Sequence, residues 1–292
     1  MSLQLPRRAA GKRGIPRTAA LVVLGLSTLF LAGCSDETAA GRLAMPDPAS
    51  EQGEHILNLW QGAWIAALIT GGLVWGLIFY ATWRFRRRSA DDPIPVQTRY
   101  NLPLEIFYTI APVIMVIVFF NHTVKTQNLV LEESERPDHT VYVVGQKWSW
   151  TFNYVEEPAG DGKVLFEAGT GSYIPKLVLP VGETTRFELR SPDVIHDFGV
   201  PGFLMKMDVI PGRNNHYEIK PTAEGTYRGA CYELCGTYHS RMLFTVDVVS
   251  PEEYEDYLEE LAATGKNDAD DIVEGPAGAY QPAGMHEDEE TS

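Results

Sequence analysis

The chain is poor in cysteine. Its 292 residues contain three, Cys34, Cys231 and Cys235. No Cys-x2-Cys-His segment is present, which excludes a fused domain carrying a covalently attached c-type haem. The second and third cysteines lie within one short stretch, and this concentration points to a metal centre.

Each end of the chain carries charge almost entirely of one sign, basic at the N-terminus and acidic at the C-terminus. Residues 1–33 contain no acidic residue, and in residues 251–292 the only basic residue is Lys266, set against fourteen acids. Residues 121–250 are only mildly acidic. The formal net charge is −15. Because nucleic-acid binding requires a basic face, this balance argues against a nucleic-acid partner.

The N-terminal stretch is typical of an export signal. A cationic region containing Arg7, Arg8, Lys12, Arg13 and Arg17 precedes a short apolar run over residues 19–32. Such a run resembles the h-region of a signal peptide. It ends in Leu31-Ala32-Gly33-Cys34, which resembles a bacterial lipobox. We predict a signal peptide over residues 1–33 and lipidation of Cys34; the alternative is an uncleaved apolar anchor.

Two later apolar runs predict membrane spans. After a polar tether over residues 34–56, a hairpin over residues 57–122 contains spans at about 59–81 and 102–121, each long enough for a hydrocarbon core. Four arginines follow the first span, so the positive-inside rule places residues 84–101 in the cytoplasm. The hairpin is then multi-pass in the plasma membrane, with the rest of the chain outside. Two buried helices of a soluble domain are the alternative.

Residues 138–250 have a different texture. Short runs rich in β-branched and aromatic residues alternate with Gly, Pro and Asp turn signals, a pattern that predicts an all-β Greek-key sandwich or barrel. Residues 251–292 are predicted to form a short acidic helix, with Ser250 as its N-cap, followed by a disordered tail.

One constellation indicates the chemistry. His196 lies 35 positions before Cys231, which is followed closely by Cys235, His239 and Met242. Thiolate, imidazole and thioether donors suit copper better than magnesium, calcium or manganese. A blue-copper site needs one thiolate, and here there are two. A structural zinc site, a redox dithiol of a copper-delivery protein and a simple disulfide remain alternatives.

The motif Cys-x-Glu-x-Cys-x3-His-x2-Met, together with Asp193-Val-Ile-His196, resembles the copper A segment of cytochrome c oxidase subunit II, in its bacterial lipoprotein form. The resemblance extends from Trp60 to about Val249. It implies a two-helix transmembrane hairpin followed by a cupredoxin-like all-β domain.

The resemblance also implies a ligand set for two copper ions. It assigns bridging thiolates to Cys231 and Cys235, terminal imidazoles to His196 and His239, a weak axial thioether to Met242 and a backbone carbonyl to Glu233.

Three further roles follow from the resemblance. Trp148 matches the residue that accepts electrons from cytochrome c, although core packing would also explain it. Glu105 matches a carboxylate at the mouth of a proton-uptake pathway, although near an interface it could simply snorkel. The carboxylates of Glu233 and Asp208 match positions around a magnesium ion shared with another subunit.

The family resemblance therefore implies an electron-transfer subunit of a proton-translocating cytochrome-c:oxygen oxidoreductase. Such a subunit accepts electrons from cytochrome c, or from a cytochrome c domain, and passes them to the haem-bearing subunit I for reduction of oxygen to water. Other oxidase subunits are expected partners. The alternative is a membrane-anchored protein that delivers or stores copper.

Overall fold

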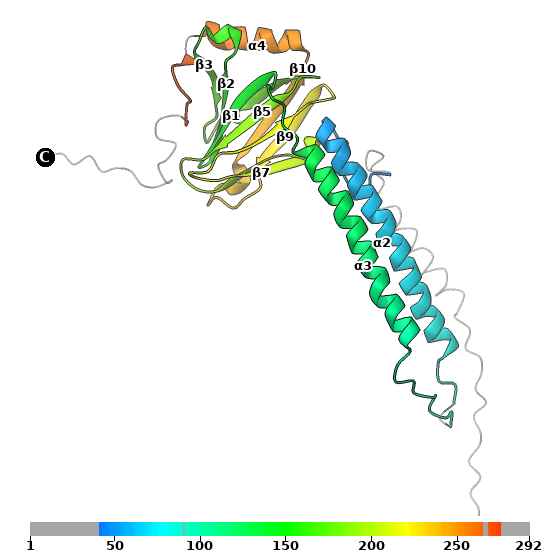
Figure 1. Cartoon of the computed structure of the whole chain (residues 1–292). Helices are drawn as coiled ribbons and strands as arrows, with labels where there is room; N and C mark the ends of the chain where they lie inside the picture. The colour runs from blue at the N-terminus through cyan, green and yellow to red at the C-terminus, as the bar shows by residue number, and fades with distance from the viewer. Residues whose placement is uncertain (1–40, 90, 265–267, 276–292) are drawn as a thin grey trace, which may run out of the picture. The chain divides into compact units, whose positions relative to one another are not determined.

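The computed structural model describes residues 41–89, 91–264 and 268–275 (Figure 1). The predicted signal peptide, Cys34 and the acidic residues after 275 lie outside the described residues. The described residues from Pro46 to Gly275 belong to one compact unit.

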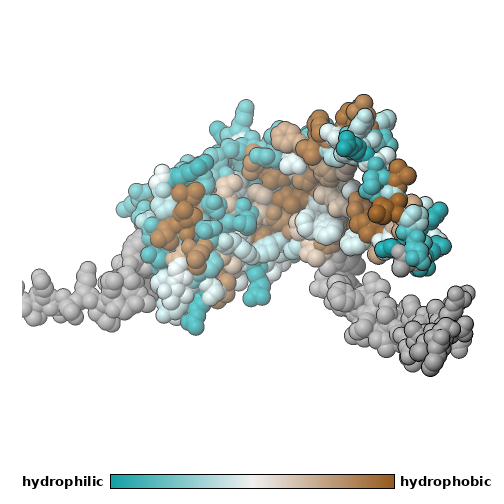
Figure 2. All heavy atoms as spheres, turned by 90° about the horizontal axis from the view of Figure 1, so that it is seen from below, coloured by the Kyte–Doolittle hydropathy of each residue, from teal (hydrophilic) through white to brown (hydrophobic). Residues whose placement is uncertain are grey.

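Two long helices come first. α2 spans Glu51–Arg84 and α3 spans Leu102–Val130. At 1.5 Å per residue they are about 51 and 44 Å long, more than the roughly 30 Å of a hydrocarbon core. Both are long and apolar enough to cross a membrane. Their large hydrophobic side chains are exposed, and Figure 2 shows brown hydrophobic surface open on the outside of the molecule.

The predicted tether over residues 34–56 is wrong for its last six residues, which form the start of α2. The Ser50 side chain accepts a hydrogen bond from the backbone N–H of Gly53 at 3.0 Å and donates one to the Phe203 carbonyl at 3.0 Å. The backbone N–H of Glu51 donates to the Lys220 carbonyl at 3.0 Å. The start of this helix is therefore fixed by an N-cap and by hydrogen bonds to residues of the later, β-rich part of the chain. The polar composition of residues 51–56 does not indicate these contacts.

The β-domain is a sandwich of two sheets. In the first sheet the strand order is β11 (Asp268–Ala269), β3 (Val164–Ala168), β2 (Ser149–Val155), β1 (His139–Gln146), β5 (Thr185–Arg190) and β8 (Asn215–Ile219). In the second it is β4 (Lys176–Pro180), β10 (Leu243–Val249), β9 (Gly225–Cys231), β6 (His196–Val200) and β7 (Met205–Val209). The pairs β1–β5 and β4–β10 are parallel, and the other pairs are antiparallel. The predicted fold class, two apolar helices followed by an all-β Greek-key domain, is confirmed.

Aromatic side chains fill the space between the sheets. The rings of Phe198 and Phe244 stack with centroids 4.8 Å apart, and Trp150 meets both edge-on at 5.5 Å. All three are almost completely buried. Each such ring removes roughly 150–250 Å² from water. This aromatic cluster packs against His196, at the start of β6, through Trp150, whose ring centroid lies 6.1 Å from that of the imidazole.

α4 (Pro251–Ala263) follows the last long strand. Ser250 and Glu253 form a capping box, in which each side chain accepts a hydrogen bond from the other residue's backbone N–H. Tyr254 and Leu258 are buried against the β-domain. The exposed side of α4 is acidic, and its apolar side packs against the β-domain.

The prediction of a disordered tail is wrong for residues 268–275, which we call the C-terminal strap. Its first two residues pair with β3, beside that strand in Figure 1. Further along, the backbone N–H of Val273 donates to Oδ1 of Asn153 at 2.8 Å, and Nδ2 of Asn153 donates to the Val273 carbonyl at 3.1 Å. A two-residue strand and a single hydrogen-bonded peptide group leave no periodic pattern in the sequence. The acidic composition therefore predicts disorder for this stretch.

His139, at the start of β1, lies between two carboxylates, those of Glu157 and Glu183. Its Nδ1 lies 2.9 Å from a Glu157 carboxylate oxygen and its Nε2 lies 2.7 Å from Glu183. Burial lowers the pKa of His139, but the two carboxylates outweigh burial, and the net pKa is raised above 6.5. The charged imidazole is therefore favoured by folding.

We expect this cluster to make the domain more stable in mild acid. Because the folded pKa of His139 exceeds the unfolded value, its contribution is fully present below pH ~6.5 and is lost as the pH rises through the folded pKa. His139→Gln should reduce this loss of stability between pH 6 and 9 by about 1.5–3 kcal/mol, the range of a hydrogen bond to a charged group. The measurement is urea unfolding of the full chain in detergent. Identical pH profiles for both proteins would show that the histidine is not linked to stability.

Candidate metal centre

The centre is built on the connection between β9 and β10, residues 231–242, which we call the metal loop. The backbone N–H of Cys231 donates to the Met242 carbonyl at 3.0 Å and closes the loop at its base. Gly236 turns the chain with a φ of 125°, a value that favours glycine. β6 lies beside β9 with Phe198 opposite Cys231. This register brings His196, at the start of β6, to the loop.

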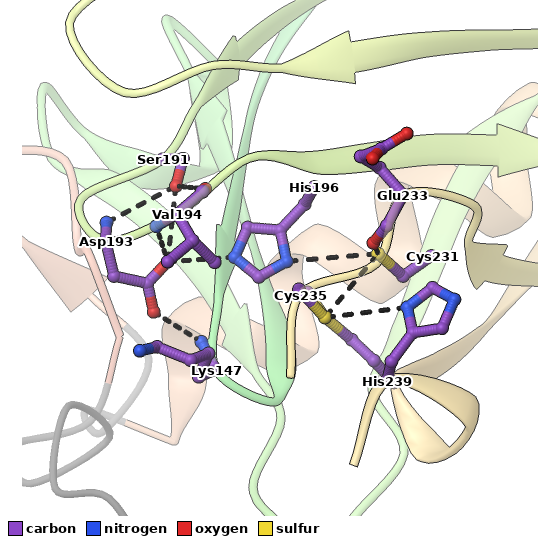
Figure 3. Close-up of polar contacts among 10 residues, drawn as sticks. Lys147, Ser191, Asp193, Val194, His196, Cys231, Glu233, Cys235 and His239 are labelled. Carbon is purple, nitrogen blue, oxygen red and sulfur yellow. Dashed lines mark hydrogen bonds and ion pairs between the residues drawn. The ribbon is translucent and has the colours of Figure 1, made fainter. Parts of the chain in front are cut away.

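The loop gathers two sulfurs, each with its own imidazole (Figure 3). The Sγ atoms of Cys231 and Cys235 are 3.9 Å apart. Nδ1 of His196 lies 3.9 Å from the first sulfur, and Nδ1 of His239 lies 3.6 Å from the second. The ligand atoms of His196 and the two cysteines all lie within 4.8 Å of one another.

Two further donors point to the same place. Sδ of Met242 lies 3.7 Å from Sγ of Cys235. The backbone carbonyl oxygen of Glu233 lies 3.2 Å from Sγ of Cys231, while the Glu233 carboxylate is turned away (Figure 3). Met242 is completely buried, and both cysteines are nearly so. All six predicted donors therefore lie at or beside the two sulfurs, and most of them are shielded from water.

The cysteines are free thiols. Their separation of 3.9 Å is far longer than a disulfide bond of about 2.05 Å, so the disulfide alternative is contradicted. Two thiolates bound at about 2.3 Å to one tetrahedral metal would lie about 3.8 Å apart. The spacing therefore fits sulfurs that share a metal ion.

Asp193 holds His196 from behind, a contact that sequence reasoning missed. One carboxylate oxygen of Asp193 lies 2.8 Å from Nε2 of His196, so the proton belongs on Nε2 and the Nδ1 lone pair faces the sulfurs. The other oxygen accepts the backbone N–H of Lys147 at 2.7 Å (Figure 3). An aspartate three residues before a ligand histidine was the available signal. One side chain thus connects the metal loop to the segment that precedes Trp148.

Removing this carboxylate should weaken metal binding. We expect Asp193→Ala to lower copper affinity about 10–100-fold, the usual effect of losing a partner of a ligand histidine. Asp193→Asn keeps an acceptor and should retain most of the affinity. Competition with a chelator measures both. Equal affinity in the alanine variant and the unmodified chain would show that His196 needs no such support.

The two thiols differ in acidity. Burial raises the pKa of both. For Cys231, the neighbouring imidazole of His196 and nearby backbone groups outweigh burial, and the pKa is lowered. For Cys235, burial and the adjacent Cys231 sulfur raise the pKa to about 12. Since metals bind thiolates, loading the site must displace at least the Cys235 proton.

The two tryptophans near the site have different surroundings. Trp150 is buried in the core, and its Nε1 donates to the Met242 carbonyl at 3.4 Å. Trp148 precedes β2 and is only partly buried. Its ring lies against the metal loop, where a Cβ added to Gly236 would come within 3.1 Å of it, and meets Tyr238 edge-on at 4.9 Å. The loop therefore touches Trp148 directly.

The remaining candidates lie away from the sulfurs. Asp208 is on β7 opposite Asp197, whose buried carboxylate pairs with Lys206 at 2.7 Å. That pairing, together with the charges of Asp208 and Glu233, raises the pKa of Lys206. Both predicted magnesium carboxylates therefore lie close enough to Lys206 to favour its charged form. Glu105 lies in the first turn of α3, where its carboxylate accepts the backbone N–H of Asn101 at 2.9 Å.

The metal loop itself exposes apolar side chains on its outer side. Leu234 is 77% exposed, and Tyr232 and Tyr238 are also exposed. An apolar rim at a buried metal site is suited to contact with another protein.

This chain is similar to known proteins. A family model described as cytochrome C oxidase subunit II, periplasmic domain, matches residues 139–249. A probable cytochrome c oxidase subunit 2 of Streptomyces coelicolor is 42% identical over 96% of this chain and 93% of its own length. Cytochrome c oxidase subunit 2 of Mycobacterium tuberculosis is 31% identical over 91% of this chain and 87% of its own length. The periplasmic domain of cytochrome oxidase subunit II from Bradyrhizobium japonicum is 28% identical, covering 45% of this chain and 99% of that one, with a TM-score of 0.40.

Proposed function

The chain belongs to the cytochrome c oxidase subunit II family, and from this premise we propose that its metal loop holds a binuclear copper centre. The residues of this loop and His196 would hold the copper, which would supply one-electron transfer from cytochrome c, or from a cytochrome c domain, to the haem-bearing subunit I. There oxygen is reduced to water with proton pumping. The whole assembly includes other oxidase subunits.

One observation carries this proposal: each sulfur has its own imidazole. Cys231 faces His196, and Cys235 faces His239, with the sulfurs side by side between them. A single tetrahedral zinc would use the same four groups but would leave Met242 and the Glu233 carbonyl without a role. The additional soft thioether beside Cys235 favours copper.

A sulfur-bridged copper pair would share one electron with little change in its bonds. The chain's own residues keep that change small. Asp193 holds the His196 ring in place by a hydrogen bond, and the stacked rings of Phe198 and Phe244 pack in the adjacent core. Trp148 lies against the loop at Gly236 and gives an incoming electron a short route to Cys235. Near-complete burial of the sulfurs excludes water from them.

The membrane arrangement completes the proposal. Residues 84–101 face the cytoplasm, and the β-domain lies outside the plasma membrane with Cys34 lipidated. Glu105, at the start of α3, then lies near the cytoplasmic side, where a proton-uptake pathway would begin. Glu233 and Asp208 offer oxygen ligands for a magnesium ion shared with subunit I.

Metal analysis and spectroscopy test the copper assignment. We expect two copper ions per chain and near-infrared absorption from a mixed-valence pair, which disappears on full reduction. A copper-delivery or storage protein would instead give a colourless Cu(I) site. Zinc, or a single copper per chain, would overturn the proposal.

A further inference from the structure

A cavity separate from the metal loop contains two arginines. It has a volume of about 350 Å³ and lies where β5 ends, beside the turn that precedes β8. Arg190 and Ser191 line one side, and Arg213 and Asn214 line the other. Glu274 of the C-terminal strap also lines it.

Neither arginine is neutralised by an ion pair within the part of the chain that the structure describes. The Arg190 guanidinium lies 4.4 Å from the centroid of the Tyr142 ring, which holds it in place without cancelling its charge. Arg213 follows Gly212, whose φ of 72° turns the chain at the cavity edge. Two guanidinium groups at one cavity are suited to carboxylate or phosphate oxygens, which they bind through paired hydrogen bonds.

The strap leads to this cavity. Asn153 clamps the Val273 peptide with both ends of its side-chain amide. Two residues later, Gly275 lies so close to Gln146 that a Cβ would come within 2.1 Å of its side chain. Asn153 and Gln146 are completely buried although both are polar. The strap therefore fits closely at the point where the described chain ends, next to the cavity.

The sequence beyond Gly275 is acidic. Residues 276–292 contain four consecutive acids, Glu287–Glu290, and no lysine or arginine. Eleven residues lie between Gly275 and Glu287, a length of chain that can span at most about 40 Å. The length of chain therefore allows these carboxylates to reach a cavity that Glu274 itself lines.

We propose that the Arg190–Arg213 cavity is a carboxylate-binding site and that its occupant is the acidic segment Glu287–Glu290 of the same chain. Binding there fixes the strap at its second end. Because the attraction is between charges near the surface, salt weakens it. The site needs no copper, so its test is independent of the proposed function.

Zero-length cross-linking tests the occupant. In the full chain carrying R213K, a carbodiimide can couple the introduced amine to any carboxylate bound in the cavity. We expect peptide mass spectrometry to find tail carboxylates joined at position 213 about fivefold more often than at position 228 in the matched R228K chain, since only the first lies at the site. The excess should disappear in 1 M salt.

A truncated chain distinguishes the tail from a free anion. In a chain ending at Gly275, inorganic phosphate should slow hydrogen exchange of the Val273 amide, and R190Q/R213Q should abolish that effect. Equal cross-linking in R213K and R228K would overturn the proposal. If phosphate still protected the truncated chain in that case, the cavity would be an anion site whose occupant is not the tail. No protection and no cross-link would exclude a carboxylate site altogether.

Discussion

Cys235→Ser is expected to abolish the binuclear centre and the oxidase activity together. Sγ of Cys235 contacts both Nδ1 of His239, at 3.6 Å, and Sδ of Met242, at 3.7 Å. A serine hydroxyl is a hard donor that stays protonated and cannot bridge two soft ions. The loss should exceed the roughly 10–100-fold effect of changing an outer partner of a ligand. Copper content, near-infrared absorption and turnover with reduced cytochrome c measure it.

The domain should remain folded in this variant, because no disulfide is lost. Far-ultraviolet circular dichroism and protease resistance check this. Thr237→Ser, an exposed change in the same loop, serves as the matched control and should keep both copper ions. Two copper ions and normal turnover in the Cys235→Ser chain would show that this sulfur is not a bridge.

The sequence predicted best what depends on a local pattern. The two apolar runs and the alternating β-segments gave the fold class, because burial in lipid or between sheets requires those patterns. The spacing within residues 231–242 predicted a set of donors that the structure brings together in one loop. The sequence grouped His196 with that loop by donor type, and the family resemblance assigned it as a ligand. The contact itself depends on sheet topology, through which β6 meets β9.

The features that sequence missed depend on single contacts between distant residues. Asp193 connects the backbone of Lys147 to the ring of His196. Its position three residues before His196 was a local signal for the second contact, but nothing in the sequence indicated the first, which spans 46 positions. The strap was assigned to a disordered tail because its hydrogen bonds come from Asn153, 120 positions earlier. Trp148 and Trp150 lie two residues apart, a spacing that places both side chains on one face when both belong to the same strand. However, β2 begins at Ser149, so only the second tryptophan follows the strand's alternation.

This difference between the two tryptophans leads to the second large effect. Trp148 donates no metal ligand, but its ring lies against Gly236, the residue after Cys235. We expect Trp148→Ala to slow electron delivery from reduced cytochrome c by about a hundredfold, because displacing a reacting partner by about 1 Å can cost that much. The copper content and spectrum should be unchanged. Stopped-flow reduction of the centre measures the rate.

Trp150→Phe provides the contrasting variant. It removes the bond from Nε1 to the Met242 carbonyl and alters a ring that meets His196 edge-on at 6.1 Å. We therefore expect a shifted copper spectrum and lower stability, with electron delivery less affected than in Trp148→Ala. A small reductant that reaches the centre without docking should reduce the Trp148→Ala protein at the normal rate. If that reductant is slowed equally, Trp148 supports the loop rather than carrying electrons into it.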